Sequence, residues 1–526
     1  MFEWMGSPAE FADPSFANLT VRFSSTTLIP AITRFFAGKS AAQLEVEGQS
    51  FGVPASVVLP PEAAVDTDQN AARQLFETIL VNGVSVRLPG SPVEVDGVRL
   101  GRQGAATQTD LAAARSALRG QASLQAKSAV GGPLEGLRVL DLGVIVVGAE
   151  TGRLLADAGA DVVKIENSAF PDGVRQTRDG SIMSASFAAG HRNKRSLELD
   201  LRHEDGKKIF LDLVAQADVL LTNFKPGTLE SLGFGAETLH AINPRLVAID
   251  SSAFGPTGPK SQRLGYGPLV RAATGLTHLW SYPGEPGSFS DAMTVYPDHV
   301  ASRLGAIAAL ALLIRRRRNQ KGGTASIAQA EIILDHLGVD MAVAALRHAG
   351  QDMIDDVRVG PWGVYPCAGD DEWCVVTVET DTQRAALAMV IGSRDGAGGK
   401  LEEALRVWLA GQSPHDAMEV LQAAGIPAGA MIRVSDMPAF KHFSDRRFFR
   451  PISNPTLQVP FLVEARPVCA AHLPDPGNAP APLMGQDGIA VVRDWLHLPD
   501  DQIAALIRQK VIGGIPENSI PESHAA

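Results

Sequence analysis

The sequence has few of the features that mark secreted, membrane-spanning or disulfide-bonded proteins. It contains three cysteines among 526 residues, Cys367, Cys374 and Cys469, without the spacing of zinc ligands. Three cysteines are too few for a disulfide framework and suit a reducing compartment. No run of eighteen uncharged apolar residues is present, and the opening MFEWMGSPAEF lacks the basic and apolar parts of a signal peptide. We therefore expect a cytoplasmic chain without membrane insertion, whose cysteines are small core residues.

The signature motifs of common enzyme classes are also missing. The sequence has no Walker A, GxSxG or HExxH motif and no Cys/His pair at metal spacing, so we expect no metal site. Gly143 and Gly148 follow an apolar run but do not form GxGxxG, which weakens a dinucleotide-binding interpretation. A formal net charge of −11 argues against nucleic acid as a partner, because phosphate binding requires a basic face.

What is present, from Leu134 onward, is an alternation of apolar runs and amphipathic segments. LRVLDLGVIVV, DVVKIE, DVLLTNF and RLVAIDSSAF predict strands, while ETGRLLADAGA and GKKIFLDLVAQA predict helices between them. Strands separated by helices of this length predict an α/β fold with a Rossmann-like, doubly wound parallel sheet.

Composition and length predict several domains, since 526 residues are too many for one compact core. We expect a front segment at residues 1–100, an Ala/Gln/Gly/Ser-rich linker at 101–133 and the Rossmann-like domain at 134–335. A smaller α+β domain is expected at 336–455, and a C-terminal return to the large domain at 456–526.

The front segment repeats the tail region. GQSFGVPASVVLPPEAAVDTDQNAARQLF aligns without gaps on LQAAGIPAGAMIRVSDMPAFKHFSDRRFF, pairing Gly52 with Gly425 and Arg73 with Arg446 at a constant offset of 373. Residues 1–100 therefore resemble a partial duplicate of the tail, without the α/β half that precedes the tail. The duplicate either packs as a partner's tail would or is the remnant of a tandem fusion.

Two clusters are candidates for binding an anionic ligand. In HRNKRSLELDL, Arg192, Lys194 and Arg195 lie together, although a solvated turn explains them equally well. In TNFKPGTLESLGF, a predicted strand runs into Asn223 and Lys225, and ligands bind at the carboxyl ends of strands in open α/β sheets.

Taken together, VLDLGVIVVGAETGRLLADAGADVVKIE, HRNKRSLELDL, TNFKPGTLESLGF, INPRLVAIDSSAFGPTGP and GYGPLVRAATG resemble the successive motifs of the family III CoA-transferases. This family includes formyl-CoA transferase, carnitine dehydratase CaiB and bile-acid-inducible F. The resemblance covers about residues 134 to 515, and the front segment resembles the family's C-terminal part. It implies an enzyme that moves CoA from an acyl-CoA donor to a carboxylic acid acceptor, in an interlocked homodimer.

The resemblance implies that Asp298, in TVYPDHVASRLGAIAAL, is the covalent nucleophile. The residues themselves predict that Asp298 is the N-cap of the helix that follows, where the positive helix end favours an ionised carboxylate. His299 is the next residue, but neighbours on a helix point in different directions.

The resemblance also implies the contacts to coenzyme A. Ile145, Val146 and Val147 match one contact loop, and Asn223, Phe224 and Lys225 match a second. The basic turn is matched by Lys194 and Arg195, and the loop that faces the nucleophile by Tyr266.

Three positions depart from the family pattern. Ala149 replaces the usual proline, and Asn167 and Ser231 replace basic residues that are potential phosphate partners.

Two other functions are weighed against CoA transfer. An α-methylacyl-CoA racemase needs an acid/base pair, and the histidine expected for it is Tyr266, whose phenol is a poor base at neutral pH. A catalytically weak CoA-binding or scaffold subunit is the other alternative, and the retained Asp298 argues against it. The sequence leaves the acyl group open.

Overall fold

The computed structural model describes residues 1–526 except positions 82, 102–109, 111, 114–131, 178–179, 283, 286, 290–293, 352–358, 394–397, 458, 466–472 and 514–526. The chain forms two compact units. The first comprises Met1–Ala345 with Pro451–Ala526, and the second comprises Leu346–Arg450. Most of the expected linker at 101–133 and all of Cys469 lie outside the described residues.

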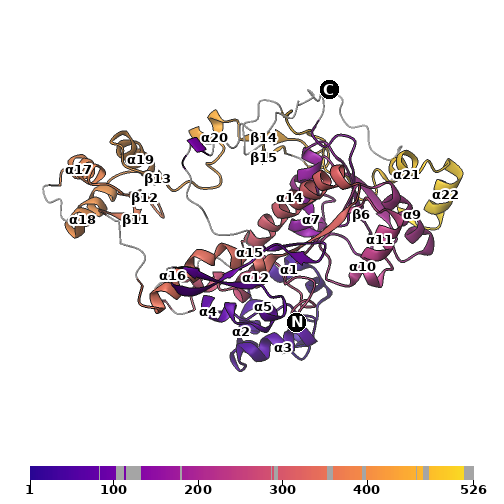
Figure 1. Ribbon diagram of the computed structural model, residues 1–526, viewed down its shortest axis with the longest axis horizontal. Coiled ribbons are helices and arrows are strands. Elements are labelled where there is room, and N and C mark those ends of the chain that lie inside the picture. The colour runs from indigo at the N-terminus through magenta and orange to yellow at the C-terminus, as the bar shows by residue number, and fades with distance from the viewer. Residues whose placement is uncertain are drawn as a thin grey trace. The chain divides into compact units, whose positions relative to one another are not determined.

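A mixed, mostly parallel sheet organises the first unit (Figure 1). Its six parallel strands stand in the order β7-β6-β5-β8-β9-β10, which is the 3-2-1-4-5-6 order of a doubly wound fold when they are counted along the chain. These strands are β5 (Arg138–Asp141), β6 (Asp161–Glu166), β7 (Arg195–Leu199), β8 (Val219–Thr222), β9 (Val247–Ser252) and β10 (Gly323–Ala328). Their near-continuous apolar runs suit strands that are buried on both faces.

Helices cover both faces of this sheet and form one core on each side. In Figure 1, α7 (Ile145–Asp157) and α14 (Tyr296–Asn319) lie on one side, where they pack against β5, β8 and β9. The other core contains side chains of α9 (Glu204–Gln216), α11 (Ala236–Ile242), α21 (Gly488–Leu496) and α22 (Asp500–Arg508). The smaller connecting helices are η3 (Gly173–Arg175), α8 (Ala185–Gly190), α10 (Thr228–Ser231), α12 (Gly267–Ala273), α13 (Leu276–Leu279), α15 (Gln329–His336) and α16 (Gly338–His348).

The first predicted strand is shorter than the apolar run that predicted it. β5 ends at Asp141, and Ile145 already begins α7. An apolar run alone does not separate a buried strand from the start of a buried helix, so the sequence predicts one long strand here.

The front segment is part of the large sheet and not a separate piece. β3 (Val93–Val95) pairs with β10, and β4 (Val98–Arg99) pairs with β3, both antiparallel. The expected division at residue 100 is therefore wrong, since strands before it extend a sheet that begins after it. At the opposite edge, β16 (Ile512–Gly513) pairs antiparallel with β7.

The remaining front elements are short helices and one hairpin. They are η1 (Ala9–Phe11), η2 (Pro14–Ala17), α1 (Leu19–Ser24), α2 (Leu28–Ala37), α3 (Ala41–Ser50), α4 (Pro61–Val65), α5 (Asp68–Ala72), β1 (Phe76–Val81) and β2 (Val84–Pro89). Ala64 and Leu75 form a small core with Leu334 of α15, so the front segment is anchored to the α/β part.

The second unit is a small α+β body with its own core. A three-stranded antiparallel sheet of β11 (Trp362–Pro366), β12 (Trp373–Thr377) and β13 (Ala428–Ala430) packs with α17 (Asp381–Val390), α18 (Gly398–Leu409) and α19 (Pro414–Ala423). Cys367 and Cys374 are buried in this core with free thiols. The helix α20 (Lys441–Asp445) also belongs to the second unit. The strand β15 (Phe461–Glu464) belongs to the first unit, and β14 (Phe449–Ile452) spans the boundary between the two.

Among the residues that the structure describes, one helix, α14, is long and apolar enough to cross a membrane by length and composition. Its buried residues pack against α7, β9 and β10 in the core of the first unit. This packing accounts for its apolar character.

Candidate active site

Asp298 lies in the first turn of α14, as the third residue of the helix. Val295 is the N-cap, so the predicted N-cap role of Asp298 is wrong by three residues. The proline at 297 explains the difference, because proline is favoured at the first helical positions and draws the helix start forward. The carboxylate still lies at the positive end of the helix.

The Asp298 carboxyl group is buried and incompletely satisfied. The residue is 4% exposed, and its Oδ2 atom has no hydrogen-bond partner in the described part of the chain. Burial raises the pKa of Asp298, while the Gln329 side chain, its own backbone N–H and that of Gly267 oppose the rise. The Gly267 backbone thus lies close to the carboxyl group, while Oδ2 accepts no hydrogen bond of normal geometry from the described residues. A buried carboxylate with an unpaired oxygen is costly for stability and suited to nucleophilic attack.

The loop before α12 closes over this carboxyl group. A Cβ atom on Gly267 would lie 2.7 Å from Asp298 Oδ2 and 2.7 Å from Val295 Cα, so only glycine fits there. Tyr266 is the N-cap of α12, with its side chain 49% exposed. The structure therefore places the Tyr266 loop beside Asp298, as the resemblance implies, and Gly267 is the residue of this loop that approaches the carboxyl group.

His299 faces a different group. Its Nδ1 atom lies 3.0 Å from Glu150 Oε1, and this contact raises the pKa of His299. Glu150 also pairs with Arg303 at 2.9 Å. His299 is thus engaged with α7 rather than with the carboxyl group of Asp298.

The two predicted contact loops meet at the switch point of the sheet, between β5 and β8. Asn223 accepts a hydrogen bond from Val144 N and donates one to Val144 O, both at 2.8 Å. Ligands of doubly wound folds bind in the crevice at this position. Asn223 therefore holds the loop at the point where a ligand is expected.

Ile145 is held in a strained conformation at the start of α7. Its φ is +56°, which is unusual for a β-branched residue. Its N–H donates to Asp172 Oδ1 at 3.0 Å, and Lys164 links Asp172 Oδ2 at 3.0 Å to the Gly143 carbonyl at 2.8 Å. Strain that is maintained by buried polar contacts occurs characteristically at functional sites.

The three apolar residues of this loop have different surroundings. Ile145 and Val146 line a cavity of about 230 Å³ together with His299, whereas Val147 is buried in the core beneath the sheet.

The basic turn before β7 is engaged inside the protein. The Lys194 ammonium is fully buried and donates to Asp141 Oδ2 at 2.7 Å, to the Ala149 carbonyl at 2.9 Å and toward His191 Nδ1 at 3.1 Å. These contacts use all three of its donors. Arg195 binds Asp161 in a bidentate pair and also Asp494. The structure therefore offers neither cation to a phosphate; sequence reasoning missed this because their partners lie elsewhere in the chain.

A cavity of about 420 Å³ opens beside the switch point. It is lined by Val144, Phe224 and two of the positions that depart from the family pattern, Asn167 and Ser231. It also contains an arginine that the sequence analysis overlooked. Arg202 follows β7 and lies over the Phe170 ring, 4.2 Å from its centroid. The only sequence signal for it is its place just after the carboxyl end of a predicted strand.

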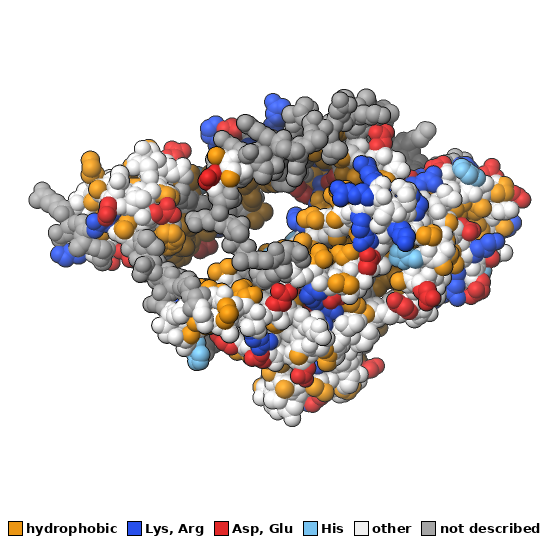
Figure 2. Space-filling model, viewed as in Figure 1, with side chains coloured by type: hydrophobic (Ala, Val, Ile, Leu, Met, Phe, Trp, Pro, Cys, Tyr) orange, Lys and Arg blue, Asp and Glu red, His pale blue; other side chains and the backbone are white. Residues whose placement is uncertain are grey.

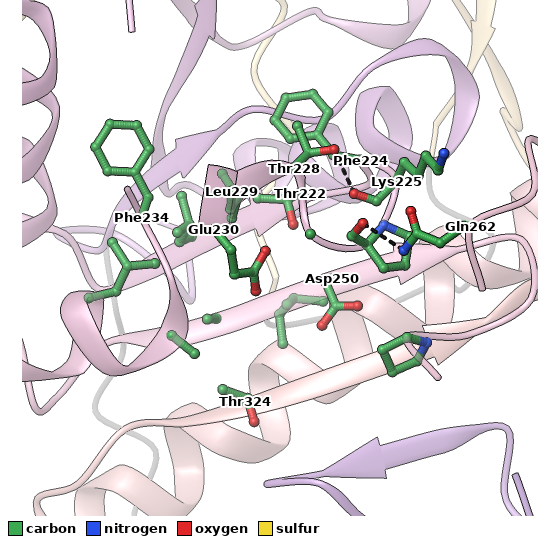
Figure 3. A pocket seen from close by; sticks show the side chains of 18 residues that line it. Thr222, Phe224, Lys225, Thr228, Leu229, Glu230, Phe234, Asp250, Gln262 and Thr324 are labelled. Carbon is green, nitrogen blue, oxygen red and sulfur yellow. Dashed lines mark hydrogen bonds between the residues drawn. The ribbon is translucent and has the colours of Figure 1, made fainter. Parts of the chain in front are cut away.

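Phe224 also lines a second cavity of about 410 Å³, shown in Figure 3. The carboxylates of Glu230 and Asp250 point into this cavity, and the ammonium of Lys225 points away from them. Asp250 accepts a hydrogen bond from Ser326 at 2.8 Å, and burial raises its pKa to about 6. An acidic cavity of this kind does not suit the phosphates of CoA.

No group of three or more potential metal ligands occurs in the described part of the chain. On the face shown in Figure 2, acidic and basic side chains are interspersed.

Comparison with known proteins identifies the family of the chain. The family described as "CoA-transferase family III" matches residues 1–107 and 134–488. The probable CoA-transferase Rv1866 of Mycobacterium tuberculosis is 40% identical over 534 residues, spanning 97% of this chain and 67% of that protein. A succinyl-CoA–D-citramalate CoA-transferase of Chloroflexus aurantiacus is 29% identical over 400 residues, spanning 72% of this chain and 98% of the relative.

The solved structures agree as well. A CAIB/BAIF family protein from Brucella suis has a TM-score of 0.59 and 26% identity, covering 69% of this chain and all of that one. The family match includes the front segment and spans most of the sequence. The chain belongs to CoA-transferase family III and is a CoA-transferase.

Proposed function

We propose that the chain transfers CoA between an acyl-CoA donor and a carboxylic acid through covalent intermediates on Asp298. The observation that carries this proposal is the buried Asp298 carboxyl group, whose Oδ2 atom lacks a hydrogen bond and lies in the first turn of α14 beside Gly267. Backbone N–H groups at a helix start can stabilise the oxyanion of a tetrahedral intermediate.

The first half-reaction forms and breaks one bond at a time. The ionised Asp298 oxygen attacks the thioester carbonyl carbon, the carbon–sulfur bond breaks, and a mixed anhydride and CoA thiolate result. The thiolate then attacks the Asp298 carbonyl carbon, which gives an aspartyl-CoA thioester and releases the donor acid. No proton is transferred, because a thiolate leaves as an anion.

The second half-reaction reverses these steps with the acceptor. Its carboxylate attacks the aspartyl thioester and releases CoA thiolate, and the thiolate attacks the acceptor carbonyl of the new anhydride. Acceptor acyl-CoA leaves and the Asp298 carboxylate is restored. Water would hydrolyse the anhydride, so the burial of Asp298 protects the intermediate.

We place CoA at the switch point, with the cavity of about 420 Å³ receiving its nucleotide end. Arg202 is the cation available to its phosphates there, since Lys194 and Arg195 are paired inside the protein. Asn223 holds the loop at the same crevice, and Phe224 lines the crevice. Lys225 and Tyr266 stay candidates for contacts to the part of CoA that lies between its nucleotide end and Asp298.

The names of relatives narrow the first substrates to test. Relatives named for succinyl-CoA with D-citramalate or L-malate, and for acetyl-CoA with oxalate, match much of this chain. We therefore propose short carboxylic acids as donors and acceptors, beginning with succinyl-CoA.

Mass spectrometry of the intact chain after incubation with succinyl-CoA, and trapping with hydroxylamine or borohydride, tests the nucleophile. We expect an adduct that maps to Asp298 and disappears in Asp298→Asn. Asp250→Asn is the matched control, because Asp250 is a second buried carboxyl group with a raised pKa and should leave the adduct unchanged. Binding of CoA without any adduct would refute the covalent route, and solvent deuterium entering the α-carbon would indicate racemase chemistry instead.

A further inference from the structure

A small cavity has walls from both the first loop predicted to contact CoA and the start of α14. Its volume is about 230 Å³, and Ile145 and Val146 of that loop line it together with His299. Pockets for drug-sized ligands measure about 300–1,000 Å³, so this cavity suits a smaller molecule. His299 directly follows Asp298 in α14. The cavity is therefore a candidate for holding the acyl group that reacts at Asp298.

One wall of this cavity carries charges that neutralise one another. Arg153, Arg192 and Glu464 line it. Arg153 contacts Asp157 at 3.0 Å and Glu464 at 2.8 Å, and Arg192 contacts Asp157 at 2.8 Å. Both arginine side chains are almost fully buried, at 5% and 1% exposed. Two guanidinium groups and two carboxylates thus leave no net charge on this wall.

The wall beside the nucleophile is not balanced in this way. Glu150 lies 3.0 Å from His299 Nδ1 and 2.9 Å from Arg303 Nη1. Arg153 is also 3.9 Å from Glu150, but its nearer partners are the two carboxylates of the first wall. When His299 is protonated, one carboxylate therefore faces two cations, and the wall has one positive charge in excess.

The contact with Glu150 favours the protonated state of His299. It raises the pKa of His299 against the effect of burial, and the charge of Arg303 opposes the rise while that of Asp298 adds to it. Imidazole titrates near neutral pH, so an upward shift increases the charged fraction there. The excess positive charge is thus favoured at neutral pH.

Both cations keep donor groups without a protein partner in the described part of the chain. Arg303 uses Nη1 for Glu150 and for the His299 carbonyl at 2.6 Å, which leaves Nη2 and Nε. His299 uses Nδ1 for Glu150, which leaves Nε2. The two side chains are 45% and 53% exposed for His299 and Arg303, so a ligand can reach them. Two charged donors beside a small cavity suit a carboxylate, which accepts on both oxygens.

We propose that His299 and Arg303 bind the second, unreacted carboxylate of the transferred acid, so that the chain selects dicarboxylic acids. This inference rests on the proposed function, because it places the acyl group of that reaction in the cavity beside Asp298. One carboxyl group of the acid reacts at Asp298, and the other supplies the negative charge that Glu150 alone does not. His299 and Arg303 determine specificity and do not touch the reacting atoms.

The alternative is that these contacts only fasten α7 to α14. Glu150 belongs to α7 and both cations belong to α14, so the ion pairs do join the two helices. A purely structural role would affect dicarboxylic and monocarboxylic acids alike. A matched pair of acids therefore separates the two roles.

Transfer of CoA from succinyl-CoA to glutarate or to valerate, acids of equal chain length that differ in one carboxyl group, tests the proposal. We expect the wild type to have a kcat/KM at least about tenfold higher for glutarate, because hydrogen bonds between charged groups are strong. His299→Gln and Arg303→Gln should each raise the KM for glutarate about tenfold with kcat nearly unchanged, and should change valerate less than about twofold. Arg318→Gln is the matched control, because Arg318 is an exposed cation in the last turn of the same helix.

Calorimetric titration of glutarate and valerate into the chain with CoA present provides a second measurement that needs no turnover. Tighter binding of glutarate that Arg303→Gln removes would support the carboxylate site, even if the absence of transfer and of an Asp298 adduct refuted the proposed function. Transfer and an adduct at Asp298 without any preference for glutarate would overturn this inference alone. An equal loss of activity toward both acids in the variants would overturn it as well.

Discussion

At the residue scale, the carboxyl group of Asp298 combines burial with an unpaired oxygen. The raised folded-state pKa means that the ionised form is less stable in the folded chain than in the unfolded one. This destabilisation is full above the folded pKa and is lost as pH falls through it toward the unfolded value of 3.8. The ionised Asp298 therefore lowers the stability of the folded chain at neutral pH, and the same unpaired oxygen is available for nucleophilic attack.

Removal of this charge should stabilise an inactive enzyme. We expect Asp298→Asn to abolish transfer and to raise the unfolding free energy of the first unit by about 1 kcal/mol at neutral pH. The gain should shrink as the pH is lowered, because the wild-type carboxyl group then takes up a proton. Thermal melts at several pH values check this, with Asp212→Asn on the exposed face of α9 as control. If Asp298→Asn were instead destabilising, the carboxylate would have a structural partner.

The arginine beside the Phe170 ring should carry much of the affinity for CoA. We expect Arg202→Ala to raise the KM for acyl-CoA about tenfold, or roughly 1.4 kcal/mol, with kcat nearly unchanged. Asn167→Lys should act in the opposite direction, since that position lines the same cavity. Initial rates over a range of acyl-CoA concentrations measure both effects. Lys208→Ala, which removes an exposed cation on α9, should change neither constant.

At the scale of elements, a buried ion pair fastens β7 beneath the loop that follows β5. Lys194 and Asp141 are 53 positions apart and fully buried, and Asp141 Oδ1 also accepts from Gly143 N at 2.9 Å. The pair thus supports the loop that the proposed function assigns to CoA. Its influence on binding is indirect.

Loss of one partner should cost far more than loss of both. We expect Lys194→Met to destabilise the first unit by about 3–5 kcal/mol, because Asp141 is left as an unpaired buried charge. The double variant Asp141→Leu/Lys194→Met should recover most of this loss. Denaturant unfolding of the two variants measures the difference. A rise in KM without a change in stability would instead support the direct phosphate contact that the resemblance implied for Lys194.

The sequence specified the elements between residues 134 and 260 because apolar runs and amphipathic segments alternate there with the right lengths. It also specified Asp298 and the loop around Tyr266 through the family motifs. It did not specify that β3 and β4 extend the sheet, because residues 93–99 carry no pattern that selects a sheet edge. Nor could it place Lys194 or Arg202, whose roles depend on partners brought together by the fold.

At the scale of the whole molecule, the chain has two sets of hydrophobic cores that share no member. The second unit builds its core from its own elements, α17, α18, α19 and β11–β13, and from the loops beside them, with Leu401, Leu405 and Leu421 fully buried. The first unit builds separate cores on the two faces of its sheet. Cooperative unfolding follows the continuity of a core, so the two units need not unfold together.

Calorimetry should therefore resolve two unfolding transitions. We expect Leu401→Ala to lower the unfolding free energy of the second unit alone by about 2–5 kcal/mol, because the substitution leaves a cavity in that core. Leu140→Ala, which removes a fully buried side chain of β5, is the matched variant and should lower only the other transition. If both variants shifted one common transition, the units would be coupled in unfolding. If they shift separately, substitutions in the second unit can be studied without disturbing the site around Asp298.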